Sequence, residues 1–231
     1  KMAAENGNPM AFASLGQIYL EGEGVVKDIT EALEWLKRGA EADNPYSQMR
    51  LGDSYLAGQG VERSKAEAEK WYERAMTNLE HQRLLRLGNN YLFGKGVERN
   101  LVTSFKNFAE TAKGGNAEGQ FRVGDALYKG LGIPKNKRDA IQWYIKAANK
   151  GNIFAKHALA QAYFNGDGIR QDRLKALKML EEAAEEGHID SLFALGQLYL
   201  HGDFVEKNIN KAFTLFEKAA KQGDANSQYD V

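Results

Sequence analysis

Apolar positions along the chain follow a helical spacing, and the whole pattern repeats every 36 residues. Ala11, Leu15 and Tyr19 stand four positions apart, which places them on one face of a helix. Gly22 and Gly24 end this segment, because glycine readily takes the positive φ of a helix stop. The Leu-Gly pair returns without slippage at Leu15-Gly16, Leu51-Gly52, Leu87-Gly88, Val123-Gly124, Leu159-Ala160 and Leu195-Gly196. A fixed period of this length is typical of a stacked array of structural repeats.

A second helix is predicted to begin thirteen positions after each of these leucines. The residue there is always a favoured N-cap type, whose side chain accepts hydrogen bonds from free backbone N–H groups. These N-cap residues are Asp28, Ser64, Asn100, Asn136, Asp172 and Asn208. Glu31 and Glu67 follow two of them by three residues, which predicts capping boxes. Ala32, Trp35 and Leu36 then form the apolar face of the second helix in the first repeat.

Two further features of the repeat predict local geometry. The small residue after each leucine is costly inside a helix, so its recurrence predicts that another helix backbone passes close to it. We expect the second helices to end at Gly115, Gly151, Gly187 and Gly223. The first two repeats lack this glycine. Asp43 or Asn44 is expected to take the left-handed turn in the first, and Leu79-Glu80 stands there in the second.

The chain is therefore predicted to be all-α, a single array of antiparallel helix pairs with few prolines and no strand-like alternation. It begins within a second helix and ends within a first helix, so we expect a fragment of a longer protein. The predicted units are a partial unit 1–8, complete units 9–44, 45–80, 81–116, 117–152, 153–188 and 189–224, and a partial unit 225–231.

Composition removes several functional classes. Lys and Arg total 31 and Asp and Glu total 31, so the net charge gives no attraction to nucleic acid. No cysteine is present, which excludes disulfides, thiol catalysis and thiolate metal sites. No apolar run is long enough to span a bilayer, so no membrane-spanning segment is predicted.

The pattern Leu-Gly-x-x-Tyr-x-x-Gly-x-Gly-Val, then Asp or Asn, then Ala-x-x-Trp-x-x-x-Ala-Ala-x-x-Gly-Asn, resembles the Sel1-like repeat, a relative of the tetratricopeptide repeat. The resemblance covers essentially the whole chain. It implies a right-handed α-solenoid that serves as an adaptor or scaffold for protein complexes. The paired cysteines of the penicillin-binding members are missing here. The resemblance carries no catalytic residues over to this chain.

No catalytic, cofactor-binding or metal-binding residue is predicted. Gly94-Lys95-Gly96 is the loop nearest to a phosphate-binding motif, but it has neither a third glycine after a strand nor a following Ser or Thr. The histidines stand at four different repeat positions without metal-ligand spacing, namely His81, His157, His188 and His201. No serine lies in a nucleophile elbow. We therefore predict no enzyme activity and no cofactor.

The face of each first helix opposite the apolar arc holds the residues one before, two after and six after the leucine, most of which are polar. We call it the polar face of the first helices, and the resemblance places it on the concave surface of the solenoid. Ala158 and Ala194 are the non-polar exceptions one before the leucine. The candidate groove residues are Ser14, Gln17, Arg50, Asp53, Arg86, Asn89, Arg122, Asp125, Lys129, Gln161, Asn165, Gln197 and His201.

Two interpretations of this face stay open. One is a solvated surface held by weak ion pairs, since Arg50 with Asp53 and Arg122 with Asp125 have i,i+3 spacing. The other is a peptide-binding track, because carboxamides and arginines can bond an extended backbone or an acidic side chain. The stretch from Arg50 to Asp125 is then the favoured part of the track.

Two irregularities leave further alternatives. The third unit has Ser104, Asn107 and Thr111 where other second helices have Ala, Trp and Ala, which predicts either a local irregularity or a partner contact. In the sixth unit Phe204 replaces the second loop glycine. It is a candidate rim contact for a partner, or it folds over the helix ends.

We interpret the sequence as a non-enzymatic adaptor or scaffold that binds a protein or peptide along the groove. The alternative is an exported bacterial envelope or host-interaction factor that engages cell-wall or exopolysaccharide machinery. Glycan binding would require exposed aromatic platforms, and the groove positions above contain none. The absence of an Asn-x-Ser/Thr sequon favours bacterial cytoplasm, periplasm or surface over the lumen of the endoplasmic reticulum.

Overall fold

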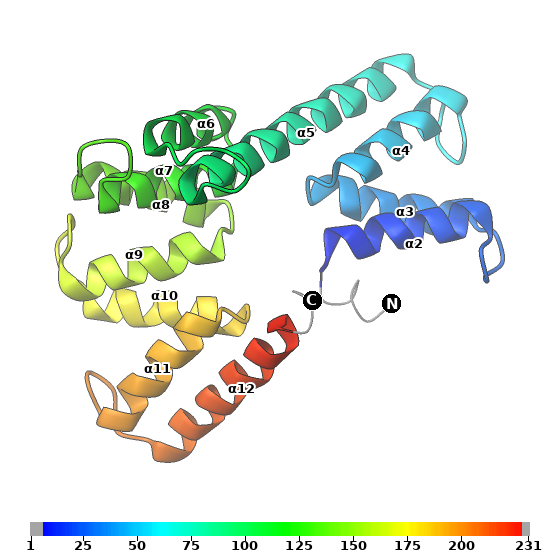
Figure 1. The fold of residues 1–231 in the computed structure, drawn as a ribbon. Coiled ribbons are helices and arrows are strands. Elements are labelled where there is room, and N and C mark those ends of the chain that lie inside the picture. The colour runs from blue at the N-terminus through cyan, green and yellow to red at the C-terminus, as the bar shows by residue number, and fades with distance from the viewer. Residues whose placement is uncertain (1–6, 228–231) are drawn as a thin grey trace. The chain divides into compact units, whose positions relative to one another are not determined.

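The computed structural model describes residues 7–227, and this part of the chain is helical with no strand. The expected all-α class is therefore confirmed. The helices are α2 (Pro9–Glu21), α3 (Ile29–Glu41), α4 (Pro45–Ala57), α5 (Lys65–Phe93), α6 (Leu101–Lys113), α7 (Ala117–Lys129), α8 (Lys137–Asn149), α9 (Ile153–Asn165), α10 (Arg173–Glu185), α11 (Ile189–His201) and α12 (Ile209–Ser227) (Figure 1). The expected partial units at the two ends lie largely outside the described residues.

The described chain forms two compact units, one up to Arg83 and the other from Leu84 onward. In the first unit α2 packs on α3, and α3 packs on α4. In the second unit the helices from α6 to α12 pack in chain order, each against the next. Helix α5 contributes its N-terminal part to the first unit and its C-terminal part to the second. Each unit is thus built from contacts between sequence neighbours, which is the pattern of repeat proteins.

The small residue after each recurrent leucine makes room for a large side chain of the following second helix. A Cβ atom built on Gly88 would lie 2.5 Å from Cε1 of Phe108, well inside van der Waals contact. The same encounter recurs in the pairs Gly16–Leu36, Gly52–Tyr72, Gly88–Phe108, Gly124–Tyr144 and Gly196–Phe216. Side-chain atoms are nearest in every pair. The expected close backbone is present in two of them, where a carbonyl oxygen of the second helix lies 3.3 Å from the built Cβ: Ala32 for Gly16 and Ala140 for Gly124. The fifth repeat has Ala160, fully buried, and packs it in one cluster with Leu180.

The loops between the helices of a repeat are turns closed by left-handed glycines, as the sequence predicts. Gly22 caps α2 with φ 75° and its N–H donates to the carbonyl of Ile18, and Gly24 follows with φ 72°. Corresponding glycines in the other described repeats have φ values of 70° to 78°. The predicted N-cap side chains all accept a backbone N–H three residues ahead: Asp28, Ser64, Asn100, Asn136, Asp172 and Asn208.

The predicted capping boxes do not close. The backbone N–H of Asp28 donates to the carbonyl of Tyr19 at 3.0 Å, and that of Ser64 donates to Tyr55 at 2.9 Å. The N–H that the box would use is therefore already satisfied by the preceding helix. Glu31 instead accepts the indole N–H of Trp35 at 2.9 Å.

The junctions between repeats differ from the sequence prediction in two places. Asp43 takes the left-handed turn with φ 58°, as expected for one of the two candidates. Leu79-Glu80 forms no junction, since it lies inside α5, a continuous helix of 29 residues in which Asn78, just before it, is also helical. Gly223 does not end its helix either, because α12 continues to Ser227. Glycine permits a left-handed stop but does not impose one.

The polar residues of the third repeat are accommodated inside a regular helix. Helix α6 is thirteen residues long, the same length as most of the other helices. The Ser104 hydroxyl donates to the carbonyl of Gly88 at 2.8 Å, which adds a hydrogen bond between α6 and α5. Thr111 and Asn107 donate to carbonyls one turn back in their own helix. Helix α6 itself is therefore regular, because each of these side chains has an acceptor within the chain. The third repeat is irregular in its first helix, which is the C-terminal part of the continuous helix α5.

The contact between Gly88 and Phe108 predicts that Gly88→Ala changes stability in opposite directions in two sequence backgrounds. We expect Gly88→Ala to destabilise the protein by about 1 kcal/mol, because overpacking against Phe108 costs about 1–3 kcal/mol and helix propensity returns up to about 1. In a Phe108→Leu background the same substitution should stabilise, since the fifth repeat already packs Ala160 with Leu180. Urea denaturation followed by circular dichroism measures both. Equal effects of Gly88→Ala in the two backgrounds would contradict the packing argument.

Candidate functional site

In the first compact unit the polar face of the first helices is bonded largely to itself. The Arg50 guanidinium donates to the hydroxyl of Tyr46 at 3.0 Å and to the Gln17 carboxamide at 3.1 Å. Asp53 lies 3.9 Å from Arg50 and accepts a 2.7 Å hydrogen bond from Tyr72. Burial and this carboxylate raise the pKa of Tyr72 to about 12. Ser14, the remaining predicted residue of this unit, donates to the carbonyl one turn back.

In the second unit the predicted residues have varied surroundings. Arg122 pairs with Glu118 at 2.7 Å and Asp125 pairs with Lys129 at 2.8 Å, so the predicted Arg122–Asp125 pair does not form. The pairs that form join residues one full helical turn apart, four positions rather than three. Four other predicted residues have no side-chain hydrogen bond within the described chain, namely Arg86, Asn89, Gln161 and Asn165, and the Asn89 amide oxygen is buried. Gln197 and His201 contact each other at 3.0 Å.

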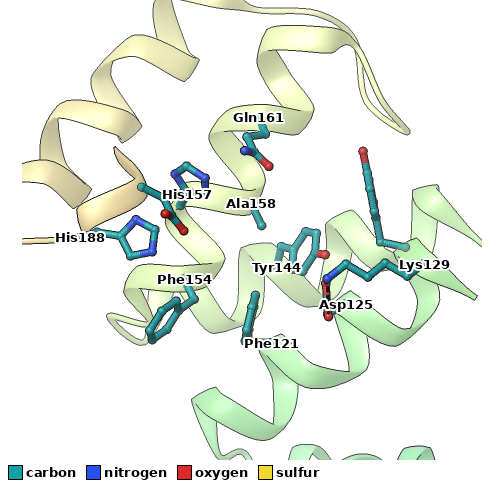
Figure 2. A pocket seen from close by; sticks show the side chains of 11 residues that line it. Phe121, Asp125, Lys129, Tyr144, Phe154, His157, Ala158, Gln161 and His188 are labelled. Carbon is teal, nitrogen blue, oxygen red and sulfur yellow. Dashed lines mark hydrogen bonds and ion pairs between the residues drawn. The ribbon is translucent and has the colours of Figure 1, made fainter. Parts of the chain in front are cut away.

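A cavity of about 300 Å³ opens beside this face, among α7, α8, α9 and α11. We call it the aromatic cavity, because the rings of Phe121, Tyr128, Tyr144 and Phe154 line it. The Phe121 centroid lies 5.9 Å from that of Phe154 and 6.0 Å from that of Tyr144. Figure 2 shows these rings with Asp125 and Lys129 on one side and the imidazoles of His157 and His188 on the other. Asp190 lines the cavity as well.

A second cavity of about 330 Å³ lies between α9 and α11, with Leu180 of α10 in its lining. We call it the apolar cavity. Its lining is Ala160, Gln161, Phe164, Asn165, Leu180, Ala194 and Leu198, with no charged residue. Gln161 lines both cavities. The sequence thus identified Asp125, Lys129, Gln161 and Asn165 as groove residues, and the structure places all four at these cavities.

Two alanines explain why the cavities occur in these repeats. Ala158 lines the aromatic cavity and Ala194 lines the apolar cavity. Both stand one before the recurrent leucine, where the second, third and fourth repeats have arginine. A short side chain at this position leaves space on the polar face that an arginine would occupy.

One wall of the aromatic cavity is a pair of histidines that share a serine. The ring centroids of His157 and His188 are 4.7 Å apart. The Ser191 hydroxyl oxygen lies 2.8 Å from Nδ1 of His157 and 2.9 Å from Nδ1 of His188. His188 also caps α11, since its Nδ1 accepts the backbone N–H of Ser191.

These contacts determine where the protons lie. Because Nδ1 of His188 accepts a backbone N–H, its own proton is on Nε2. The arrangement that makes every short contact a hydrogen bond has His157 Nδ1–H donating to Ser191, and the Ser191 hydroxyl donating to His188. Burial lowers the pKa of His157 to about 4 and also lowers that of His188, while Asp190 opposes both shifts. Both rings are therefore neutral at pH 7.

Sequence reasoning missed this pair because it searched for metal-ligand spacing within single helices. Two signals were available. His188 occupies the N-cap position of a first helix, which Asn8, Asn44, Asn116 and Asn152 fill in other repeats. His157 and Ser191 are 34 residues apart, close to one period, which places them side by side on neighbouring repeats.

Phe204 packs over the ends of two helices. It takes the left-handed conformation with φ 64°, as the glycine of other repeats does. Its ring meets Phe164 edge-on at 5.4 Å, and the guanidinium of Arg173 lies 3.9 Å from its centroid. About half of its side chain, 54%, stays exposed. The structure therefore gives Phe204 an intramolecular packing role, and contact with a partner stays a prediction.

Three further features of residues 7–227 bear on function. No group of three or more histidine, aspartate or glutamate side chains is placed to hold a metal ion in this range. The Ser191 hydroxyl is fully buried, so it is not accessible to a substrate. Within the same range no helix combines the length and apolar character needed to cross a membrane.

Comparison with known proteins agrees with the repeat spacing. The family model described as Sel1 repeat matches residues 10–44, 45–76, 84–116, 117–152, 153–188 and 189–224. A Sel1 repeat protein from Oxalobacter formigenes is similar in structure with a TM-score of 0.60 and 30% identity, over 93% of this chain and 86% of that one. A protective antigen of uropathogenic Escherichia coli strains with an SLR fold has a TM-score of 0.54 and 33% identity. The match covers 98% of this chain but only 49% of that antigen. A search of curated proteins found no significant match.

The histidine pair predicts a pH dependence of stability. The pKa of His157 is about 4 in the folded protein and about 6.5 in the unfolded chain. The unfolded state therefore binds more protons between these values, so the free energy of unfolding should fall as pH decreases from about 6.5 towards 4. Protonation of His188 on Nδ1 would in addition remove the cap of α11.

Urea denaturation at several pH values between 7.5 and 4.5 measures this dependence. We expect His157→Gln to lose less stability than the wild-type protein over that range. His201→Gln is the matched control, because His201 is exposed at the end of α11, outside the pair. If His157→Gln follows the wild-type curve throughout, the buried neutral pair is not the source of the dependence.

Proposed function

We propose that this chain, which belongs to the Sel1 repeat family of generally protein-interacting scaffolds, binds an extended peptide segment of a partner protein on the polar face of α7, α9 and α11. The observation that carries the proposal is a pair of neighbouring cavities with Gln161 in the lining of both. Concave helix faces are the usual binding surfaces of repeat arrays.

Gln161 has the chemistry to hold a peptide backbone. Its side chain is exposed and makes no hydrogen bond within the described residues. A carboxamide offers one acceptor and two donors, which match the C=O and N–H of a peptide unit. An extended segment that crosses Gln161 can bond to it with both groups and leave its side chains to the cavities.

An extended chain can place alternate side chains in two neighbouring cavities. Side chains two residues apart project from the same side, and each residue advances about 3.3 Å. Two such side chains are therefore about 7 Å apart. A segment that fills both cavities with alternate residues has its intervening peptide units over Gln161.

The sequence favoured the stretch from Arg50 to Asp125, whereas this proposal places the binding surface later in the chain, on α7, α9 and α11. In the first unit Arg50, Gln17 and Asp53 already have partners within the chain, so a ligand would have to compete for them. Gln161 and Asn165 have none within the described chain.

We also propose that the chain works without catalysis. Sel1 repeat proteins are typically non-enzymatic scaffolds. The one hydroxyl held between two imidazoles belongs to Ser191, which is buried and serves the cap of α11. The two cavities and the Gln161 carboxamide support binding by shape and by hydrogen bonding.

Selection from a random nine-residue peptide library displayed on phage tests the proposal. We expect the immobilised chain to enrich peptides whose synthetic forms bind in solution, measured by fluorescence anisotropy. Ala158→Arg should weaken this binding at least tenfold. It fills the aromatic cavity with the side chain that Arg50, Arg86 and Arg122 place at the same repeat position.

The matched control adds the same side chain elsewhere. Asn149→Arg places an arginine on the exposed end of α8, outside both cavities, and should bind like the wild-type protein. Circular dichroism confirms equal helicity of the variants. Failure to enrich any peptide, or equal loss in both variants, would refute peptide binding at this face.

A further inference from the structure

The charges around the aromatic cavity are unbalanced toward the acidic side. Asp125 and Asp190 line it together with one lysine, Lys129. Lys129 pairs with Asp125 at 2.8 Å, whereas Asp190 is exposed and has no ion-pair partner among the described residues. The two imidazoles of the wall are held neutral by burial, so they add no positive charge at pH 7. One carboxylate is thus available to a cationic ligand group.

The rings of the cavity suit a cation as well. A guanidinium or ammonium group is attracted to the face of an aromatic ring. Phe154 is half exposed, at 50%, and the Phe121 ring stacks beside it. A flat guanidinium on such rings keeps its N–H groups free to bond a carboxylate in the same plane.

The chain already holds cations of its own in this manner at the same cavity. The Arg122 guanidinium lies 5.6 Å from the centroid of Phe121 and pairs with Glu118. The Lys137 ammonium lies 5.2 Å from the centroid of Tyr128 and donates to Asp167 at 2.6 Å. The Tyr128 hydroxyl also donates to Asp167. A ring and a carboxylate therefore share one ammonium group beside the cavity, and Asp190 with the cavity rings offers the same combination to a ligand.

The apolar cavity favours an uncharged, apolar side chain instead of a cation. Its walls are aliphatic and aromatic apart from the carboxamides of Gln161 and Asn165. A charged group placed there would lose its hydration without a counter-ion, which is strongly unfavourable. Leucine, isoleucine, methionine or phenylalanine would bury apolar surface against Leu180 and Leu198 at no such cost.

We infer that the partner segment carries an arginine or lysine for the aromatic cavity and, two residues away, a large apolar side chain for the apolar cavity. This inference rests on the proposed function and adds the chemistry of the two anchors. The recognised class is a basic-apolar peptide motif, in which the carboxylate of Asp190 selects the charge and the apolar cavity selects the neighbour.

The test is a change of specificity by charge reversal. The random nine-residue phage library is selected against the wild-type chain, Asp190→Lys, and the control Glu206→Lys. Glu206 is exposed in the α11–α12 loop, so this control makes the same charge change outside both cavities. We expect the wild type and the control to enrich Arg or Lys two residues from a large apolar residue. Asp190→Lys should enrich Asp or Glu at the first position and keep the apolar one.

Synthetic peptides then measure how much the basic residue and the apolar residue each contribute to binding. In the wild-type consensus peptide, changing the basic residue to Glu should weaken binding at least tenfold to the wild-type chain and strengthen it to Asp190→Lys. Changing the apolar residue to Ser should weaken binding to both proteins. Raising the salt concentration should weaken the wild-type peptide more than a peptide with a neutral residue in place of the cation.

The outcomes separate the two proposals. If no peptide is enriched, peptide binding itself fails. If peptides bind and Ala158→Arg blocks them, but they lack a basic residue or respond equally to Asp190→Lys and Glu206→Lys, the inference about the anchors is overturned and peptide binding stands. Enrichment of acidic peptides by the wild-type chain would likewise overturn it.

Discussion

The contact between a small residue of each first helix and a large side chain of the following second helix is the constraint on which the structure depends. It brings the two helices of a repeat together, and the same second-helix side chain can also bond the polar face, as Tyr72 does with Asp53. The small partner is glycine in five of the described repeats and alanine, Ala160, in the remaining one, while the large partner is leucine, tyrosine or phenylalanine. The helix pair therefore accommodates a change of residue type on either side of the contact.

The candidate site arises where a few positions depart from that common pattern. Alanine replaces arginine at Ala158 and Ala194, and histidine replaces asparagine at His188. Each change alters only the surface or a cap, so the packing of the helices continues undisturbed through α9 and α11. Within the second unit, the regular helix packing thus carries a local surface whose residues differ from those of the neighbouring repeats.

The parts of this structure that sequence could predict are those in which one residue determines the outcome locally. The N-caps, the left-handed loop glycines and the turn at Asp43 belong to this group, because a side-chain acceptor or a tolerated positive φ acts within a few residues. The continuous helix α5 did not follow from the period, which sets a unit boundary between residues 80 and 81, because Asn78 permits a helix stop there but does not impose one. Groove positions such as Gln161 followed from helical spacing. The cavities did not, since their volume depends on side chains from several helices, and the shared Ser191 links histidines of different repeats.

The hydrogen bond from each N-cap residue back to the preceding helix bears on how the chain reaches this structure. The bond joins residues nine positions apart, as in Asp28 to Tyr19, and it recurs in every complete repeat from Asp28 to Asn208. Closing so short a loop loses little chain entropy and takes well under a microsecond in a flexible chain. Because contacts within such a chain are mainly local, rapid folding that starts at any one helix pair and spreads to its neighbours is the expected kinetic behaviour.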